Sequence, residues 1–308
     1  MAGPSVTRVA AVSGSFSHDL AFDLERATSI IEEAREREVE LLVLPHGVLG
    51  GYVGDLDPDL DDPPDVPPMV ALDGPEVAEL VAAAGDLVVC FGLTEDRGGR
   101  PGNTAVCVDG SGILGVHRKV HLPPGEVRWY KPGDGCAAFD TPVGRIGMLV
   151  DYDKTFPEAA RSLALDGAEL LAFVCAWPLS LTAQAARVSQ DRQSLLFELY
   201  DRARAAENQV VVVTSNLTGG QGQLRFFGQA KVVQPDGQIV ARTGFRPGWA
   251  VADIEVGTLV ANARRRQHHL AERRPRAYLQ ESGSTVGLPG AGDAAPARSA
   301  RSAGRAER

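Results

Sequence analysis

The feature that most constrains the fold is the alternation of short apolar runs with longer amphipathic segments. Each apolar run predicts a strand; the runs are VTRVAAVSG, ELLVLPHG, DLVVCFGL, GRIGMLVDYD, AELLAFVCAWP and QVVVVTSN. The segments between them favour helices, several with apolar residues at helical spacing; they are residues 20–38, 75–84, 156–167 and 183–208. This order is typical of an α/β protein.

Two predicted hairpins interrupt the strand–helix alternation. The segment TAVCVDGSGILGVHRK places its turn at residues 109–112, and FFGQAKVVQPDGQIVART forms the second hairpin. Strands therefore outnumber helices. This favours one sheet packed on another with helices outside, rather than a simple Rossmann domain.

The length and composition indicate one large domain followed by a tail. The chain has 308 residues, and 44% of them are hydrophobic, which is enough to form a large core. We predict that the domain spans residues 1–281. From Ser282 the sequence is rich in Ala, Gly, Ser, Pro and Arg and has almost no large apolar residue, so we expect residues 282–308 to be disordered.

The net charge of −9 disfavours a nucleic-acid partner, which would need a basic surface. Part of the excess lies in the acidic stretch 55–65, predicted to be a solvated loop. It does not fit a calcium-binding loop, because Leu60 and Val66 stand where Gly and Glu are needed. No apolar run is long enough to cross a bilayer, and the N-terminus lacks a signal-peptide pattern, so we expect a cytoplasmic protein.

The chain has four cysteines and no CxxC pair, which gives a zinc site no support. Cys90 and Cys107 lie in apolar, strand-like runs. We expect them to be buried, reduced thiols.

Several segments, in order, resemble the carbon–nitrogen hydrolase (nitrilase) superfamily. They are ELLVLP, HRKVHLPPGEVRWYKPG, GRIGMLVDYDKTFPE, AELLAFVCAWP, RARAAENQVVVVTSN with FFGQAKVVQPDG, and ERRPRAYL, spanning residues 6–279. The resemblance implies a four-layer α-β-β-α sandwich and a homodimer or larger assembly across the helices that follow the FPE and ENQ segments. It also implies chemistry on small molecules at amide, nitrile or carbamoyl carbon, without a metal or an organic cofactor.

The same resemblance assigns the site residues. The family uses a Cys nucleophile, a Glu base, a Lys that stabilises the oxyanion and a second, supporting Glu. Lys119 and Glu126 match the lysine and the supporting glutamate, but His46 stands at the base position and Asp151 at the nucleophile position. The residues implied to surround the substrate are Tyr152, Trp177 and Cys175.

A carboxylate is a poor nucleophile toward an amide. Its attack would give a mixed anhydride, and the tetrahedral adduct would expel the carboxylate before the amine. We therefore predict that ordinary cysteine-dependent amidase or nitrilase activity is lost. We also expect Asp151 to pair with Lys119, since an unpaired buried charge is costly.

Three interpretations remain open. In the first, the protein is a pseudoenzyme that binds a small amine- or amide-type metabolite or serves only as a subunit. In the second, Asp151 orients His46, which acts as a general base with Lys119 as the electrophile. In the third, Cys175 supplies the thiol. No metal is expected, because Lys119 would repel a cation from these carboxylates.

Overall fold

The computed structural model describes residues 5–60 and 65–278. The predicted tail from Ser282 lies outside these ranges. The main unit extends to Ala271, and a short C-terminal unit begins at Glu272 and contains the single-turn helix η3 (Pro275–Ala277).

Two sheets form the centre of the main unit. The first has the order β11-β10-β1-β2-β3-β4-β5, and β14 also pairs with β1. Its strands are β1 (Thr7–Gly14), β2 (Leu41–Val43), β3 (Val88–Glu95), β4 (Gly102–Asp109), β5 (Gly112–Arg118), β10 (Asn216–Gln221), β11 (Leu224–Phe227) and β14 (Gly248–Ile254).

The second sheet has the order β13-β12-β9-β8-β7-β6. Its strands are β6 (Phe139–Thr141), β7 (Gly144–Val150), β8 (Leu170–Val174), β9 (Val211–Thr214), β12 (Lys231–Val233) and β13 (Ile239–Arg242). The central strands β7, β8 and β9 are parallel, so their carboxyl ends meet at one edge of the sheet.

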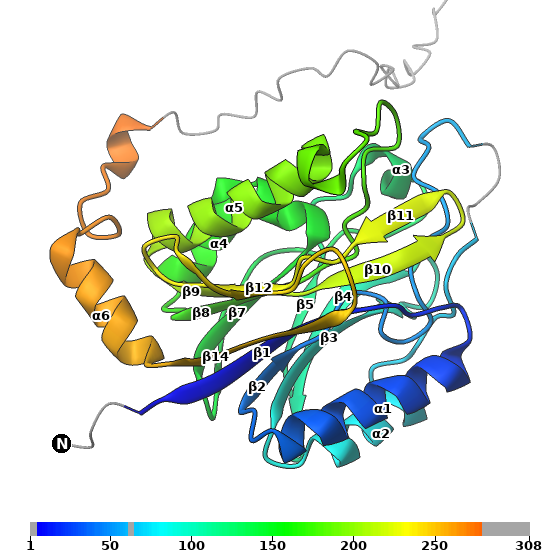
Figure 1. The fold of residues 1–308 in the computed structure, drawn as a ribbon, viewed down its shortest axis with the longest axis horizontal. Helices are drawn as coiled ribbons and strands as arrows, with labels where there is room; N and C mark the ends of the chain where they lie inside the picture. The colour runs from blue at the N-terminus through cyan, green and yellow to red at the C-terminus, as the bar shows by residue number, and fades with distance from the viewer. Residues whose placement is uncertain (1–4, 61–64, 279–308) are drawn as a thin grey trace, which may run out of the picture. The chain divides into compact units, whose positions relative to one another are not determined.

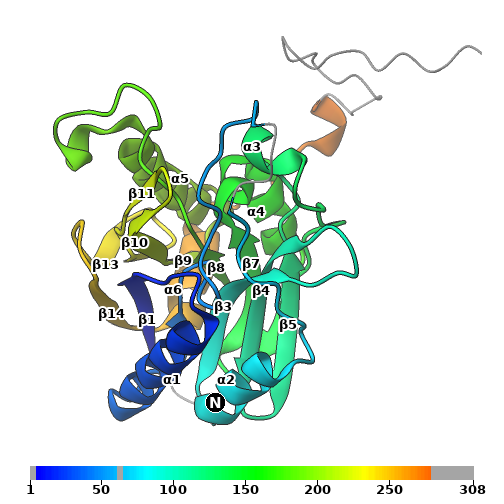
Figure 2. The ribbon, with the colours of Figure 1, turned by 90° about the vertical axis from the view of Figure 1, so that its right-hand side faces the viewer.

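Helices cover the outer face of each sheet (Figures 1 and 2). Helices α1 (Leu20–Glu36) and α2 (Pro75–Ala84) lie against the first sheet, and α4 (Pro157–Leu165) and α5 (Arg192–Asn208) lie against the second. The remaining helices are α3 (Pro124–Val127), α6 (Val256–Arg266) and the short turns η1 (Asp151–Thr155) and η2 (Val188–Gln190). The predicted four-layer α-β-β-α sandwich is confirmed.

The central strands β2, β8 and β9 are apolar at every position but Thr214, because each sheet is covered on both faces. In β1, Val9 and Ala11 point into the core between the two sheets, whereas Ala10 and Val12 point toward helices α1 and α2. Alternate residues of a strand face opposite sides. A continuous apolar run is therefore what a central strand of this sandwich requires.

Both hairpins are confirmed: β4 pairs with β5 and β12 with β13, each antiparallel. Cys90 and Cys107 are buried and free. Within the acidic stretch, Asp57 and Asp59 are exposed, as predicted for a surface loop, although residues 61–64 lie outside the described ranges. No described helix is both long and apolar enough to span a membrane.

The predicted helix 183–208 is wrong over its first nine residues, because α5 begins at Arg192. Asp191 caps it by accepting a hydrogen bond from the backbone N–H of Gln193 at 2.9 Å. Ala183 has a φ of 53°, which a regular right-handed helix does not allow. The assembly was expected across the helices that follow the FPE and ENQ segments. Helix α4 does follow the FPE segment, but the ENQ segment lies at the end of α5 and no helix directly follows it.

Candidate functional site

Asp151 stands at the point where β7 ends and the chain turns sharply into η1. Its φ is 41°, a left-handed conformation that costs a non-glycine residue about 1 kcal/mol. The turn places its buried carboxylate at the edge where the parallel strands end. There Oδ1 accepts the backbone N–H of Ala176, which follows β8.

Lys119 follows β5 of the first sheet and contacts Asp151, which follows β7 of the second sheet. Its Nζ lies 3.5 Å from Asp151 Oδ2 and 2.9 and 2.8 Å from the two oxygens of Glu126. All three side chains are buried. The structure therefore brings together Lys119, Glu126 and Asp151, with one ammonium group between two carboxylates.

Tyr52 belongs to the same network, although the sequence analysis missed it. Its hydroxyl donates to Glu126 Oε1 from the glycine-rich loop after β2. Burial and the neighbouring Glu126 hold the pKa of Tyr52 well above its usual range, so the phenol remains a donor. The signal available in the sequence was an aromatic residue among glycines shortly after the first motif.

The charges in this network depend on one another. Burial works to lower the pKa of Lys119, but Glu126 and Asp151 outweigh it and hold that pKa above its ordinary value. Burial raises the pKa of Asp151, and Lys119 and the Ala176 N–H only partly oppose this. Lys119 is therefore an ammonium ion, whereas burial works against the charged form of Asp151, which a further positive partner would favour.

His46 is fully buried and does not reach Asp151. Its Nε2 lies 3.3 Å from Asn103 Oδ1, and its ring packs edge-on against Tyr52 with the centroids 5.5 Å apart. Burial, with a smaller contribution from Lys119, lowers the pKa of His46 to about 4, so the ring is neutral at pH 7. Within the described ranges no hydrogen bond or ion pair joins His46 to Asp151, so the predicted orientation of His46 by Asp151 is not what the structure shows.

A cavity of about 320 Å³ opens onto the charged network. Lys119 and Asp151 form its charged end together with Tyr52. The other walls are mostly apolar or aromatic, and they include Leu56, Pro58, Pro123, Pro124, Tyr152, Ala176, Trp177, Pro178, Leu179, Leu181 and Gln193. Tyr152 and Trp177 thus line the cavity, and Trp177 Nε1 donates to Gln193 Oε1 at 3.0 Å.

Cys175 does not stand on the cavity wall. It is fully buried in the apolar layer between the second sheet and helices α4 and α5. Burial raises the pKa of its thiol to about 12, the opposite of what an activated nucleophile needs. The hypothesis that Cys175 supplies the thiol therefore has no geometric support.

Asp153 connects the turn η1, which contains Asp151, with the segment that contains Lys119. It accepts hydrogen bonds from His117 Nε2 and His121 Nδ1, both at 2.8 Å, and from the backbone N–H of Val120 and His121. Burial opposes ionisation, but the hydrogen bonds from His117 and His121 hold the pKa of Asp153 far below its usual value. His121 is therefore structural.

A second buried ionic cluster anchors the same turn to α5. Lys154 Nζ lies 2.8 Å from Asp201 Oδ1, and Lys231 Nζ of β12 lies 2.7 Å from Asp201 Oδ2; all three side chains are fully buried. Arg204 donates to the backbone oxygens of Lys154 and Thr155. Helix α5 thus holds η1 from its outer side.

No group of three or more His, Cys, Asp or Glu side chains is arranged to hold a metal in the part of the chain that the structure describes. The fold and the site together define a protein class. It is a nitrilase-like sandwich in which a lysine, a glutamate and a strand-end turn meet at one cavity.

Comparison with known sequences identifies the family. Residues 8–264 match the sequence model described as carbon-nitrogen hydrolase, and the chain belongs to this family. It is 28% identical to omega-amidase NIT2 of Mus musculus over 289 residues, covering 90% of this chain and 99% of that protein. It is 30% identical to an (R)-stereoselective amidase of Pseudomonas sp. over 260 residues, covering 83% of this chain and 87% of that protein.

Solved structures agree with this assignment. The carbon-nitrogen hydrolase of Helicobacter pylori G27 aligns with a TM-score of 0.76 at 26% identity, covering 89% of this chain and 97% of that chain. A mutant of the Nesterenkonia AN1 amidase aligns with a TM-score of 0.67 at 25% identity, covering 85% of this chain and 98% of that chain.

Proposed function

We propose that this protein is a member of the carbon–nitrogen hydrolase family that binds a small amine- or amide-type metabolite without ordinary cysteine-dependent hydrolysis. The observation that carries the proposal is that Asp151 itself occupies the hydrogen-bond donors around it. Its two oxygens already face the Ala176 N–H and the Lys119 ammonium group. These two donors would otherwise be available to a developing oxyanion.

The chemistry of Asp151 supports the same conclusion. The family resemblance aligns it with the position of the cysteine nucleophile. A carboxylate there cannot expel an amine from the adduct it would form, whereas a thiolate can. The neutral, buried His46 faces Asn103 and not the cavity, which leaves the alternative of His46 general-base catalysis without a supporting contact.

The charge balance favours an amine as the ligand's polar group. With both carboxyl groups ionised, Asp151 and Glu126 set two negative charges against the one positive charge of Lys119, so a cationic ligand would balance the network and favour the charged form of Asp151. A carboxylate can accept about four hydrogen bonds, and Asp151 uses two, which leaves capacity for an ammonium donor. The aromatic walls at Tyr152 and Trp177 suit a short apolar body attached to the amine.

Calorimetric titration with an amine panel tests this proposal. We expect primary amines with short apolar chains to bind, and the matching carboxylates not to bind. Asp151→Asn should weaken amine binding at least about tenfold, because it replaces a charge-assisted hydrogen bond by a neutral one. Binding of carboxylates in preference to amines, or amine binding unchanged in Asp151→Asn, would contradict the proposal.

The location and the assembly are also proposals. We place the protein in the cytoplasm, which the free state of all four cysteines supports, since a reducing compartment keeps thiols free.

We propose a homodimer or larger assembly, as the family resemblance implies. Leu165 at the end of α4 is 47% exposed and offers an apolar contact for a second copy.

A further inference from the structure

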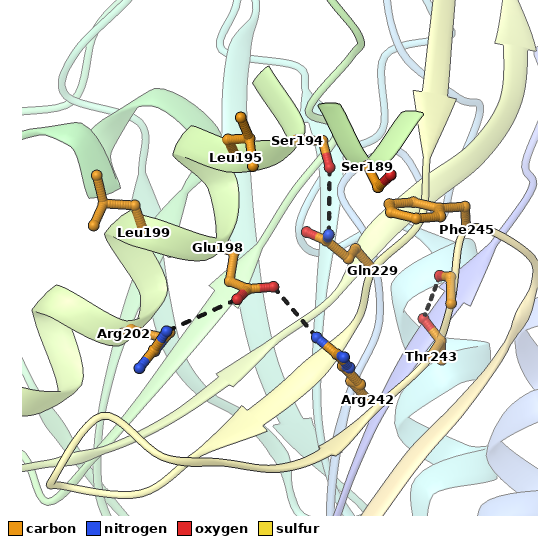
Figure 3. A pocket seen from close by; sticks show the side chains of 11 residues that line it. Ser189, Ser194, Leu195, Glu198, Leu199, Arg202, Gln229, Arg242, Thr243 and Phe245 are labelled. Atoms are coloured by element: carbon orange, nitrogen blue, oxygen red, sulfur yellow. Dashed lines mark hydrogen bonds and ion pairs between the residues drawn. The ribbon is translucent and has the colours of Figure 1, made fainter. Parts of the chain in front are cut away.

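A second cavity lies beside α5, and none of its lining residues lines the first cavity. Its volume is about 440 Å³, and it is bounded by α5, by Gln229 two residues before β12, and by the end of β13 with the segment that follows (Figure 3). The residues that matter for its chemistry are Ser194, Leu195, Glu198, Gln229, Arg242 and Phe245.

Gln229 is the unusual residue of this cavity. Its φ is 69°, a left-handed conformation that a glycine would adopt without strain. Its side chain is only 7% exposed, and its Nε2 donates to Ser194 Oγ at 3.3 Å. Oε1 finds no hydrogen-bond partner among the described residues. A strained glutamine with an unpaired buried acceptor is costly, which points to a donor that arrives with a ligand.

The charged groups of the cavity leave a positive excess. Glu198 stands between two guanidinium groups, 3.5 Å from Arg242 and 4.0 Å from Arg202 (Figure 3). One carboxylate thus faces two cations. Both arginine side chains are more than half exposed, so their remaining N–H donors are accessible to an anion.

The same cavity carries apolar surface. Leu195 and Leu199 of α5 are each 57% exposed, and Phe245 is 39% exposed. All three line the same cavity as the arginines (Figure 3). Burial of these side chains by a ligand would be favourable, and it complements the polar groups at Gln229 and Arg242.

We propose that this cavity is a second ligand site, for a small organic anion that carries an N–H or O–H donor next to a short apolar chain. The donor bonds Gln229 Oε1, the anion pairs with Arg242, and the apolar chain packs on Leu195 and Phe245. The inference does not depend on the proposed function of the first cavity.

The two cavities lie on either side of the first turn of α5. Ser194 lines the second cavity, whereas the adjacent Gln193 lines the first and accepts from Trp177. Asn216 makes a further connection, since it accepts from the backbone N–H of Trp177 and donates to the backbone oxygen of Gly228. A binding experiment must therefore separate the two sites by variants in each.

N-acetyl-L-leucine is a suitable probe, because it combines a carboxylate, an amide N–H and an isobutyl group. We expect the full chain to bind it in calorimetric titration with a dissociation constant of about 1 mM, as its small size implies. Two matched compounds each lack one feature: 4-methylpentanoate has no N–H donor, and the methyl ester of N-acetyl-L-leucine has no charge. Both should bind at least about fivefold more weakly if each polar contact contributes.

Variants assign the binding to this cavity. Gln229→Gly relieves the backbone strain and removes the acceptor, and Arg242→Gln removes an exposed cation. Each should raise the dissociation constant of the probe at least about fivefold. Asp151→Asn, in the first cavity, should leave probe binding unchanged. The absence of binding at millimolar probe, equal binding of all three compounds, or binding lost in Asp151→Asn but kept in Arg242→Gln would each overturn the proposal. Arg242→Gln alters only a surface side chain and keeps the test valid if Gln229→Gly does not fold.

Discussion

His46 shows how strongly a single environment determines the behaviour of a residue. A histidine near a lysine and a glutamate, as His46 is near Lys119 and Glu126, would ordinarily be a candidate proton carrier. Here it is fully buried, its Nε2 faces Asn103, and Gly92 packs so closely that a Cβ there would lie 2.3 Å from His46 Nδ1. The ring is thereby fixed as a neutral packing element next to Tyr52.

The depressed pKa of His46 makes a prediction about stability. The folded state holds its pKa at about 4, against an ordinary value of 6.5, so between these pH values the unfolded chain binds more protons. The contribution of His46 is therefore fully present above pH 6.5 and is lost as the pH falls toward 4. It amounts to at most about 3 kcal/mol.

Urea denaturation of the wild type and of His46→Gln over this pH range measures that contribution. We expect the stability of the wild type to fall more steeply than that of the variant, which has no titrating ring at this position. Parallel pH profiles for the two proteins would show that His46 is not held neutral by the fold.

At the scale of elements, the turn η1 is held between two ionic clusters. Asp153 ties it to His117 of β5 and to His121 after that strand, and Asp201 of α5 ties it to that helix through Lys154. The second cluster has two ammonium groups and one carboxylate, all without solvent exposure. Burial, partly offset by Asp201, lowers the pKa of Lys231 to about 8.

Removal of the shared carboxylate should therefore be severe. Asp201→Asn leaves two ammonium groups buried without a counter-charge, and we expect a loss of about 3–5 kcal/mol in the free energy of unfolding. The matched control Asp140→Asn removes an exposed carboxylate paired with Arg145 and should cost less than about 1 kcal/mol. Equal effects of the two substitutions in urea denaturation would contradict the anchoring role of Asp201.

Most central strands could be predicted from the sequence because each is covered on two faces and is largely apolar. Shorter elements such as β6 and β11 carry too few residues for a periodic pattern, and they form because a longer neighbour offers hydrogen bonds. The start of α5 was missed because the capping role of Asp191 depends on local backbone geometry rather than on apolar spacing.

The site was predictable only in part, for a similar reason. Motif order predicted that Lys119, Glu126 and Asp151 lie together, and the structure places them in contact. Lys119 and Asp151 directly follow strands whose positions the fold dictates, and Glu126 lies in α3, shortly after β5. Motif order did not reveal that Cys175 points into the layer under α4 and α5, or that His46 packs behind Tyr52, because the direction of a side chain at a strand end depends on the local turn.

At the scale of the whole molecule, the site exists only because two sheets stack. Lys119 and Tyr52 come from loops of the first sheet, whereas Asp151 and Trp177 follow strands of the second. The family fold is thus retained, and the lysine and glutamate that the resemblance assigns to the site, Lys119 and Glu126, lie together in it. The proposed change of function lies in Asp151 and His46, at the positions that the resemblance assigns to the nucleophile and the base.

Ammonia release from a broad panel of small amides tests this account most directly. We compare the wild type, Asp151→Asn and the double variant Asp151→Cys with His46→Glu, each shown to be folded. The account predicts no release by the wild type and detectable release by the double variant, which regains a thiol and a carboxylate base beside Lys119. Ammonia release by the wild type that Asp151→Asn abolishes would contradict it.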